Sequence, residues 1–360
     1  MYRHIGTEAG AAVDAIAPIF RTHHVERHFA GAGLVKRGDA TLFSGAYGYA
    51  HMGWRIPNTV STRFDTASIT KLFTTVAVLQ LVERGCLSLD DKVLDILELN
   101  GTAISPQVSV YHLLTHSSGI GDDADEEAGE SYEAIWKDKP NYSIRETVDF
   151  LPQFVNKPAN FEPGEGCRYN NRAFVLAGLV VEKLTGMKYR DCVSENVFRR
   201  AAMASTEFAA MDDVAENVAE GYAAVEDDDG KLIGWRKNIY SYPPIGSPDA
   251  GALTTVGDLD RFMRALKGNE LLSKQLTDDL FLPKVEYMQT ARARYMMGYC
   301  FEFALELGGG RIMYMQKDGE NPGVDCVLRY YPDTDTTVAI LANHDCDVWT
   351  MANDVHEVLA

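Results

Sequence analysis

Strand-like patterns lie at the two ends of this sequence, and helix-like patterns fill the region between them. Residues 28–49 carry two short runs of small, aromatic and β-branched residues around the turn Arg37-Gly38-Asp39, which predicts a hairpin. Four more runs near the C-terminus are separated by turns rich in glycine, proline and aspartate, at Tyr299–Leu307, Arg311–Lys317, Val324–Tyr331 and Thr337–Ala342. We therefore expect the two ends to supply one antiparallel sheet.

Apolar residues at helical spacing predict the helices of the chain. One helix, at about residues 9–24, precedes the hairpin, and another follows the last strand. Six lie between them, at about residues 66–84, 108–115, 143–153, 171–185, 189–199 and 255–267. The acidic stretches Asp122–Glu127 and Glu226–Asp229 are expected to be solvated loops. The prediction is an α+β fold, with a discontinuous sheet domain of residues 1–65 and 246–360, flanked by the terminal helices, and an inserted, mostly helical domain of residues 66–245.

Composition excludes several functions. With 360 residues, 46% of them hydrophobic, the chain is an ordinary globular protein, and its net charge of −18 repels phosphate backbones and so excludes nucleic acid as a partner. We expect no membrane span and no signal peptide, which predicts a cytoplasmic protein unless a secretory leader has been trimmed. The six cysteines lack CxxC spacing and are expected to be free thiols. His23, His24 and His28 lack the spacing of a zinc protease, so no metal is predicted there.

The helix expected at residues 66–84 carries the first chemical signal. From Thr66 to Val82 its only charged residue is Lys71, and a helix that is apolar on nearly every face is buried. The lysine either reaches the surface or loses solvation, which lowers the pKa of its amine toward the range of a general base. Ser68 lies on the same face, near the helix N-terminus. The pair is either an activated nucleophile with its base or a capping serine beside a surface lysine.

Two further segments place polar side chains beside apolar elements. Tyr169 and Asn171 follow the Pro-Gly turn at Phe161–Gly164 and precede an apolar helix, where they either project into a cleft or pack and cap the helix. Lys317 and Gly319 lie at the end of a strand. A glycine there lets a substrate approach the backbone, and the lysine adds positive charge; the alternative is a solvated strand end.

In this order and spacing, these segments resemble the serine β-lactamase and penicillin-recognising enzyme superfamily, in the branch of class C β-lactamases, D-alanyl-D-alanine peptidases, D-aminopeptidases and related esterases. The resemblance covers most of the chain and implies an active site in the cleft between the sheet and the helical domain. It rests on seven motifs, which are Ser68–Lys71, Leu87–Asp91, Leu113–Gly119, Tyr169–Asn171, Gly251–Thr255 with Asp258, Lys317–Gly319 and Val338–Asn343.

The resemblance implies the catalytic roles. Ser68 attacks a carbonyl and forms an acyl-enzyme, while Lys71 and Tyr169 share the proton transfers. Tyr169 acts as a phenolate or proton shuttle whose pKa two lysines lower. His116, within the Leu113–Gly119 motif, is structural. No metal or organic cofactor is required.

The resemblance also implies how a substrate is held. Asn171 hydrogen-bonds the acyl side chain, and Lys317 steadies the tyrosine and faces any substrate carboxylate. Gly319 gives access to the strand backbone. The backbone N–H groups of Ser68 and Glu320 form the oxyanion hole.

Asp318 is a departure from the family pattern, because β-lactamases carry threonine or serine after this lysine. That hydroxyl helps to bind the substrate carboxylate, whereas Asp318 and Glu320 should repel it. We therefore expect a serine hydrolase acting on an ester or amide, of the carboxylesterase or D-amino-acid peptidase type, with a neutral or amine-bearing small-molecule substrate. The alternatives are a class C-type β-lactamase or penicillin-binding DD-peptidase, and a non-catalytic ligand-binding relative. No oligomeric state is predicted.

Overall fold

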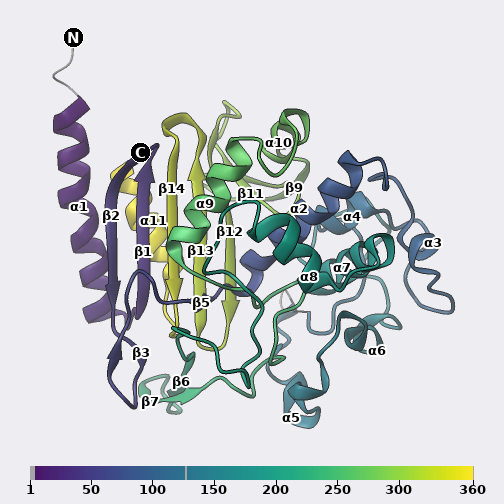
Figure 1. Cartoon of the computed structure of the whole chain (residues 1–360), viewed down its shortest axis with the longest axis horizontal. Helices are drawn as coiled ribbons and strands as arrows, with labels where there is room; N and C mark the ends of the chain where they lie inside the picture. The colour runs from purple at the N-terminus through teal and green to yellow at the C-terminus, as the bar shows by residue number, and fades with distance from the viewer. Residues whose placement is uncertain (1–4, 126–127, 360) are drawn as a thin grey trace.

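The computed structural model describes residues 5–125 and 128–359, and its centre is an eight-stranded antiparallel sheet (Figure 1). The strand order is β2-β1-β14-β13-β12-β11-β10-β9. Because β14 lies between β1 and β13, the N-terminal hairpin pairs directly with the C-terminal strands, and Gly31 lies opposite Ala342. The predicted α+β fold is confirmed. The strands are β1 (Gly31–Arg37), β2 (Ala40–Tyr47), β9 (Val285–Gln289), β10 (Arg294–Met297), β11 (Glu302–Leu305), β12 (Ile312–Asn321), β13 (Val324–Tyr331) and β14 (Thr336–Ala342).

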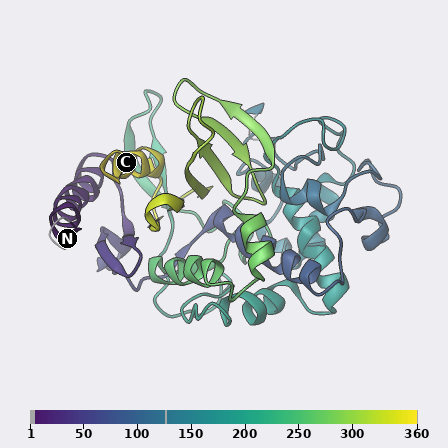
Figure 2. The same cartoon turned by 90° about the horizontal axis from the view of Figure 1, so that it is seen from above.

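Strand β14 is buried on both faces of the sheet. Successive side chains of a strand point to opposite faces. Val338 and Ile340 pack with apolar residues of the two terminal helices, α1 and α11, whereas Ala339 and Leu341 belong to the larger core cluster on the other face. Helix α9 contacts β1 and β14 on that second face, opposite α11 (Figure 2). The three covering helices are α1 (Ile5–Glu26), α9 (Val256–Lys267) and α11 (Val348–Leu359).

Helix α2 (Thr70–Glu83) is the centre of the helical part of the molecule. Every residue of α2 up to Leu81 is buried, which explains why its sequence is apolar on all faces. Helix α7 (Asn171–Thr185) packs against it, is capped by the Asn170 side chain, and ends at Gly186 in a left-handed conformation. The shorter helices are α3 (Val93–Leu97), α4 (Val110–Leu114), α5 (Ile135–Asp138), α6 (Leu151–Phe154), α8 (Tyr189–Val193) and α10 (Lys274–Leu280).

Several predicted boundaries differ from the structure. The strand expected at Tyr299–Leu307 begins only at Glu302, because Cys300 adopts a left-handed backbone (φ 70°) that interrupts an extended chain. The helix expected at residues 189–199 changes into a π-helical turn at Ser194–Phe198. Strands β9 and β10, which extend the sheet beyond β11, lie outside the predicted strands.

The two acidic stretches differ from each other. Asp122 and Asp123 are buried, so the prediction of a solvated loop is wrong for them, and residues 126–127 lie outside the described residues. Glu226–Asp229 is exposed, as predicted, but it forms the tip of a β-hairpin within the expected helical domain. The domain boundaries themselves stay a prediction. The hairpin strands are β6 (Tyr222–Glu226) and β7 (Leu232–Lys237).

The histidines near the N-terminus have separate partners. His23 Nε2 lies 2.8 Å from Asp354 Oδ2, and His24 Nδ1 donates to the backbone oxygen of Phe29 at 2.7 Å, so both help to fasten α1. The six cysteines are free thiols. Within residues 5–125 and 128–359, no helix combines the length and the apolar character that crossing a bilayer would require.

Candidate active site

Ser68 lies at a sharp turn between the sheet and α2. The turn consists of β5 (Phe64–Asp65) and the 3-10 helix η1 (Ala67–Ile69). Ala67 is fully buried with a left-handed φ of 40°, which costs a residue with a side chain about 1–2 kcal/mol. Its N–H donates to Asp65 Oδ1 at 2.7 Å. Strain of this kind is concentrated at functional sites, and here it holds a half-buried serine at the start of a helix.

Lys71 is buried behind Ser68. Its Nζ lies 2.9 Å from Ser68 Oγ, 2.8 Å from Asn171 Oδ1 and 2.8 Å from the backbone oxygen of Asp249. Burial lowers the pKa of Lys71 to about 8; Asp249 raises this pKa, and Lys317 lowers it further. The prediction of a desolvated lysine beside the serine is confirmed, and the surface-lysine alternative is wrong.

Tyr169 lies between two lysines, just before α7. Its ring centroid is 5.0 Å from Lys71 Nζ and 4.9 Å from Lys317 Nζ, and the His116 ring stacks on it at 4.5 Å. Burial raises the pKa of Tyr169 well above its usual value, although Lys317 and a hydrogen bond with Ser68 act in the opposite direction. The expected lowering of this pKa is therefore wrong, because desolvation of a phenolate outweighs the nearby cation. Tyr169 is a neutral hydrogen-bonding group at physiological pH.

Lys317 is already paired within the site. Its Nζ donates to Asp318 Oδ1 at 2.7 Å, and its side chain is 5% exposed. Burial alone would lower the pKa of Lys317, but Asp318 raises it above its ordinary value, so the lysine is charged. Its charge is largely balanced by Asp318 before any substrate carboxylate arrives.

Gly319 lies where β12 passes closest to the Ser68 turn. A Cβ atom at Gly319 would lie 2.2 Å from the backbone oxygen of Thr66 and 2.9 Å from the backbone nitrogen of Ser68. The sequence suggested that this glycine admits a substrate, but the group that approaches it is the chain's own backbone. The next residue, Glu320, carries one of the two N–H groups proposed for the oxyanion hole. The close approach of Gly319 brings β12 alongside the other, the N–H of Ser68.

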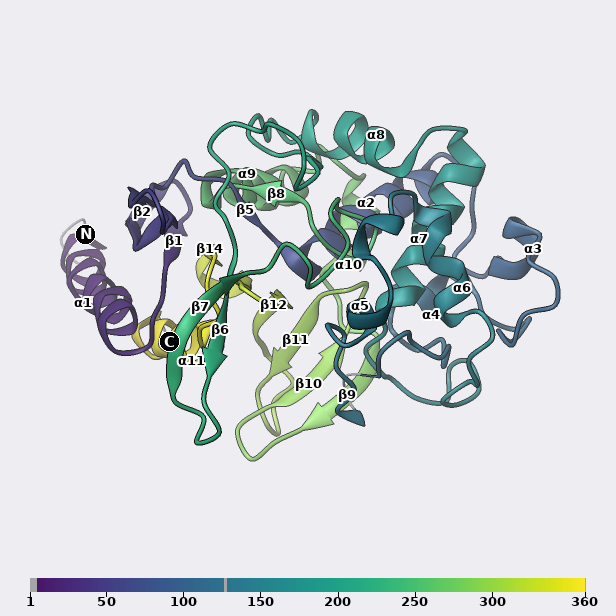
Figure 3. The same cartoon turned by 90° about the horizontal axis from the view of Figure 1, so that it is seen from below.

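A cleft of about 690 Å³ opens in front of Ser68. Figure 3 shows the end of β12 between the β6–β7 hairpin and α5, and residues of the hairpin and of the segment before α5 line the cleft. Tyr169 also lines it, whereas Asn171 contacts Lys71 and is 9% exposed. The carboxylates of the lining are Glu130, Glu133, Glu302, Asp318, Glu320, Asp325 and Asp345.

The charge balance of this cleft is acidic. Of its basic side chains, Lys317 is paired with Asp318 and Arg236 with Glu133. Burial and the nearby Asp318 together raise the pKa of Glu302 to about 7, as expected where carboxylates share one space. An incoming anion therefore meets a surplus of negative charge, and an incoming cation is attracted.

A buried ionic cluster lies behind Lys71, and the sequence analysis did not predict it. Arg172 is fully buried on α7; it donates to Asp249 Oδ2 at 2.8 Å and to Asp123 Oδ2. Its guanidinium also lies 4.4 Å from the Phe150 ring centroid. The backbone oxygen of the same Asp249 accepts from Lys71, so the cluster holds the segment that positions this amine. A lone arginine within the apolar helix at residues 171–185 was the available signal.

Comparison with known proteins adds independent information. The sequence profile described as Beta-lactamase matches residues 16–357. Penicillin-binding protein 4* of Bacillus subtilis (strain 168) is 27% identical over 340 residues, which are 91% of this chain and 71% of the relative. The crystal structure of a penicillin binding protein from Bacillus halodurans has 36% sequence identity and a TM-score of 0.87, covering 96% of this chain and 100% of that one.

A more distant solved structure shares the fold. The D-amino acid amidase from Ochrobactrum anthropi SV3 is 20% identical with a TM-score of 0.78, and the match covers 96% of this chain and 98% of that one. The same architecture therefore extends to chains with little remaining sequence similarity.

Proposed function

This chain belongs to the beta-lactamase family, and from that premise we propose that it is a serine hydrolase that cleaves esters or amides through an acyl-serine at Ser68. The observation that carries the proposal is the 2.9 Å contact between Ser68 Oγ and the amine of Lys71, a lysine whose pKa burial lowers to about 8. An amine that is partly neutral near physiological pH can accept the serine proton.

The proposed reaction uses groups of the cleft in sequence. The neutral amine of Lys71 takes the Ser68 proton as Oγ attacks the substrate carbonyl carbon. The carbonyl oxygen gains the negative charge and is held by the N–H groups of Ser68 and Glu320. The ammonium of Lys71 then returns its proton to the leaving alcohol or amine, directly or through the neutral hydroxyl of Tyr169. Water repeats the attack on the acyl-serine with Lys71 as base, which releases the acid and restores Ser68.

The charges of the cleft support a neutral or amine-bearing substrate. Asp318 engages Lys317, the residue proposed to meet a substrate carboxylate, and Glu320 is two residues away. A penicillin carries a carboxylate and would enter against this field. An amide or ester of a D-amino acid carries an amine that the field attracts, so we propose this class as the preferred substrate.

A penicillin-recognising activity is the second candidate, favoured by the relatives named penicillin-binding proteins at 27% and 36% identity. The two candidates differ in how Asp318 acts. If Asp318 excludes penicillins, Asp318→Thr should gain acylation by benzylpenicillin, whereas a native penicillin-recognising enzyme is acylated without the substitution.

The test measures release of p-nitrophenol from p-nitrophenyl butyrate, release of p-nitroaniline from D-alanine p-nitroanilide, and loss of benzylpenicillin. After each reaction, the mass of the intact protein shows whether a covalent adduct has formed. We expect turnover of the first two, which Ser68→Ala abolishes and which the exposed-loop variant Ser61→Ala retains. Acylation by benzylpenicillin at Ser68 of the native chain would establish the second candidate. No turnover and no adduct with any of the three would contradict the hydrolase proposal and favour a non-catalytic ligand-binding relative.

A further inference from the structure

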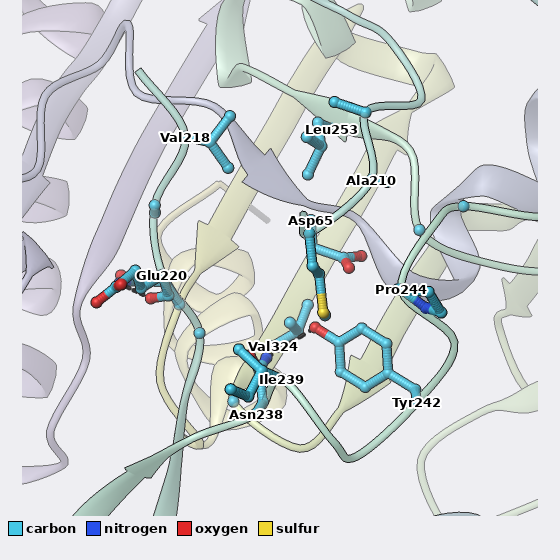
Figure 4. Close-up of a pocket in the computed structure, with 18 of the residues that line it drawn as sticks. Asp65, Ala210, Val218, Glu220, Asn238, Ile239, Tyr242, Pro244, Leu253 and Val324 are labelled. Atoms are coloured by element: carbon cyan, nitrogen blue, oxygen red, sulfur yellow. Dashed lines mark hydrogen bonds between the residues drawn. The ribbon is translucent and has the colours of Figure 1, made fainter. Parts of the chain in front are cut away.

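A second cavity lies beside the Ser68 turn, and among the residues that the structure describes none of its lining is shared with the cleft. It encloses about 370 Å³, and Asp65, the last residue of β5 in that turn, forms part of its wall (Figure 4). The cleft is lined by Ala223 and Pro322, whereas the cavity is lined by Gly221 and Gly323. Two chain segments, 221–223 and 322–323, therefore separate the cavity from the cleft. They are in close contact, because a Cβ on Gly323 would lie 2.6 Å from the backbone of residue 222.

The walls of this cavity are mainly apolar. Figure 4 shows side chains from segments far apart in sequence turned toward the same hollow, namely Ala210, Val218, Ile239, Pro244, Leu253 and Val324. The acidic lining residues are Asp65, Asp213 and Glu220. Lys237 also lines the cavity, but it donates to Glu220, so the remaining carboxylates give the hollow a negative charge.

Asp65 is a carboxylate held by neutral groups. Its Oδ1 accepts from the N–H of Ala67 at 2.7 Å, and the Tyr242 hydroxyl hydrogen-bonds its side chain. Burial raises the pKa of Asp65 to about 6, which leaves it ionised at neutral pH. A buried charge whose partners are neutral gains stabilisation from a cation placed beside it.

Two residues that line the cavity hydrogen-bond the backbone of Ala67, the residue before Ser68. The N–H of Ala67 donates to Asp65, and its carbonyl oxygen accepts from the N–H of Gly251 at 3.3 Å. Asp65 and Gly251 both line the cavity. A ligand that moves or neutralises Asp65 therefore acts directly on the left-handed Ala67 and, through it, on Ser68.

We propose that this cavity is a second ligand site, for a small primary amine with an apolar body, whose ammonium group pairs with Asp65 and alters the backbone that presents Ser68. The size is suitable, since a cavity of about 150 Å³ holds benzene and 370 Å³ leaves room for an alkylamine chain. The apolar walls accept the apolar body of the ligand, and the surplus of carboxylates favours the ammonium cation over a neutral or anionic analogue.

Calorimetric titration with 2-phenylethylamine tests the binding step, which does not depend on the proposed hydrolase activity. We expect binding that weakens about tenfold or more in Asp65→Asn and with 2-phenylethanol, its neutral analogue. Ile239→Trp should abolish binding, because Ile239 lines the cavity and is 44% exposed, so a larger side chain fits at its rim. The matched control is Ile233→Trp, at a 63% exposed isoleucine of β7 outside the lining, which should bind as the native chain does.

The location of the amine distinguishes this cavity from the acidic cleft. Loss of binding in Asp318→Asn with full binding in Ile239→Trp would place the amine in the cleft and overturn the proposal. Absence of measurable binding at millimolar amine would overturn it equally, and so would equal affinity for 3-phenylpropionate.

The coupling to Ser68 is read by nuclear magnetic resonance, again without reference to turnover. The amide resonances of Ala67 and Ser68 should shift as the native chain is titrated with 2-phenylethylamine, and should stay unchanged in Ile239→Trp. Binding with unmoved Ala67 and Ser68 resonances would refute the coupling. If the chain hydrolyses p-nitrophenyl butyrate, saturating amine should also change its kcat by at least twofold in the native chain and in Ile233→Trp, but not in Ile239→Trp.

Discussion

Lowering the pH below 8 should slow hydrolysis in proportion to the neutral fraction of Lys71. Burial lowers the pKa of this lysine to about 8. A group with that pKa is neutral in about 1% of molecules at pH 6, about 9% at pH 7, about 50% at pH 8 and about 91% at pH 9. If the neutral amine is the general base, kcat/KM rises about ninefold from pH 6 to 7 and less than twofold from pH 8 to 9.

The assay is kcat/KM for p-nitrophenyl butyrate between pH 6 and 9.5 at constant ionic strength, since this ester has no ionisable group of its own in that range. Lys71→Arg keeps the charge but cannot lose its proton, so activity should fall by about 10²–10⁴. Lys317→Gln removes a cation that lowers the pKa of Lys71, so the inflection should move to higher pH. Lys274→Gln, at a 75% exposed side chain, is the control that should leave the inflection unchanged.

Three outcomes would contradict this account of the base. The first is a rate that stays constant between pH 6 and 8, and the second is an inflection below pH 7. The third is a Lys71→Arg variant that keeps the native profile, which would assign the proton transfer to another group.

Three further substitutions test the structure around the site. Arg172→Met leaves buried carboxylates unpaired at a cost of about 3–5 kcal/mol. Since the unfolding entropy is about 2.1 cal/mol/K per residue over 360 residues, the Tm measured by calorimetry should fall by about 4–7 °C. An unchanged Tm would contradict the ionic role of Arg172. Gly319→Ala should lower both Tm and hydrolysis because its Cβ would lie 2.2 Å from the oxygen of Thr66, while Gly234→Ala, with nothing within 4 Å, should change neither. Burial raises the pKa of Glu302 to about 7, so its contribution to stability is present below about pH 4.5 and lost as the pH rises through 7. Glu302→Gln should therefore raise Tm relative to the native chain at pH 8.5 but not at pH 4.5, and an equal gain at both would contradict the burial of this charge.

The parts of the fold that the sequence predicts are those set by local pattern. The apolar stretch around Lys71 fits one structure only, a buried helix, and α2 is that helix. The strand runs at both ends carry alternating or continuous apolar residues between turn residues, and they form one sheet. The motif order identified the family because its polar residues recur at spacings that chance rarely produces together.

Burial depth is what the sequence could not supply. The neighbours of Tyr169 were predicted correctly, but the sign of its pKa shift depends on how completely solvent is removed from the ring. Gly319 was identified as a site of close approach, yet its partner, the Thr66 backbone, is about 250 residues earlier in the chain and only the folded structure brings it near. Both errors concern distances between segments rather than the segments themselves.

The acidic stretch at Asp122–Asp123 illustrates the same point for charge. A run of acids is usually a solvated loop, and local composition contains no sign of Arg172 beyond the apolar helix that carries it. Tertiary packing overrides the local preference, because a buried guanidinium needs carboxylates around it.

The central position of β14 has a consequence for how the chain acquires its structure during synthesis. Gly31 pairs with Ala342, so β1 leaves the ribosome about three hundred residues before β14, its second neighbour in the sheet, exists. Until then the N-terminal hairpin presents an open edge, and β12, which lines the cleft with Lys317 and Glu320, is also missing. Nascent chains therefore contain Ser68 and Lys71 long before the strand that bears Lys317 has been made. During synthesis the unpaired hairpin must therefore be protected against aggregation until β14 has been made.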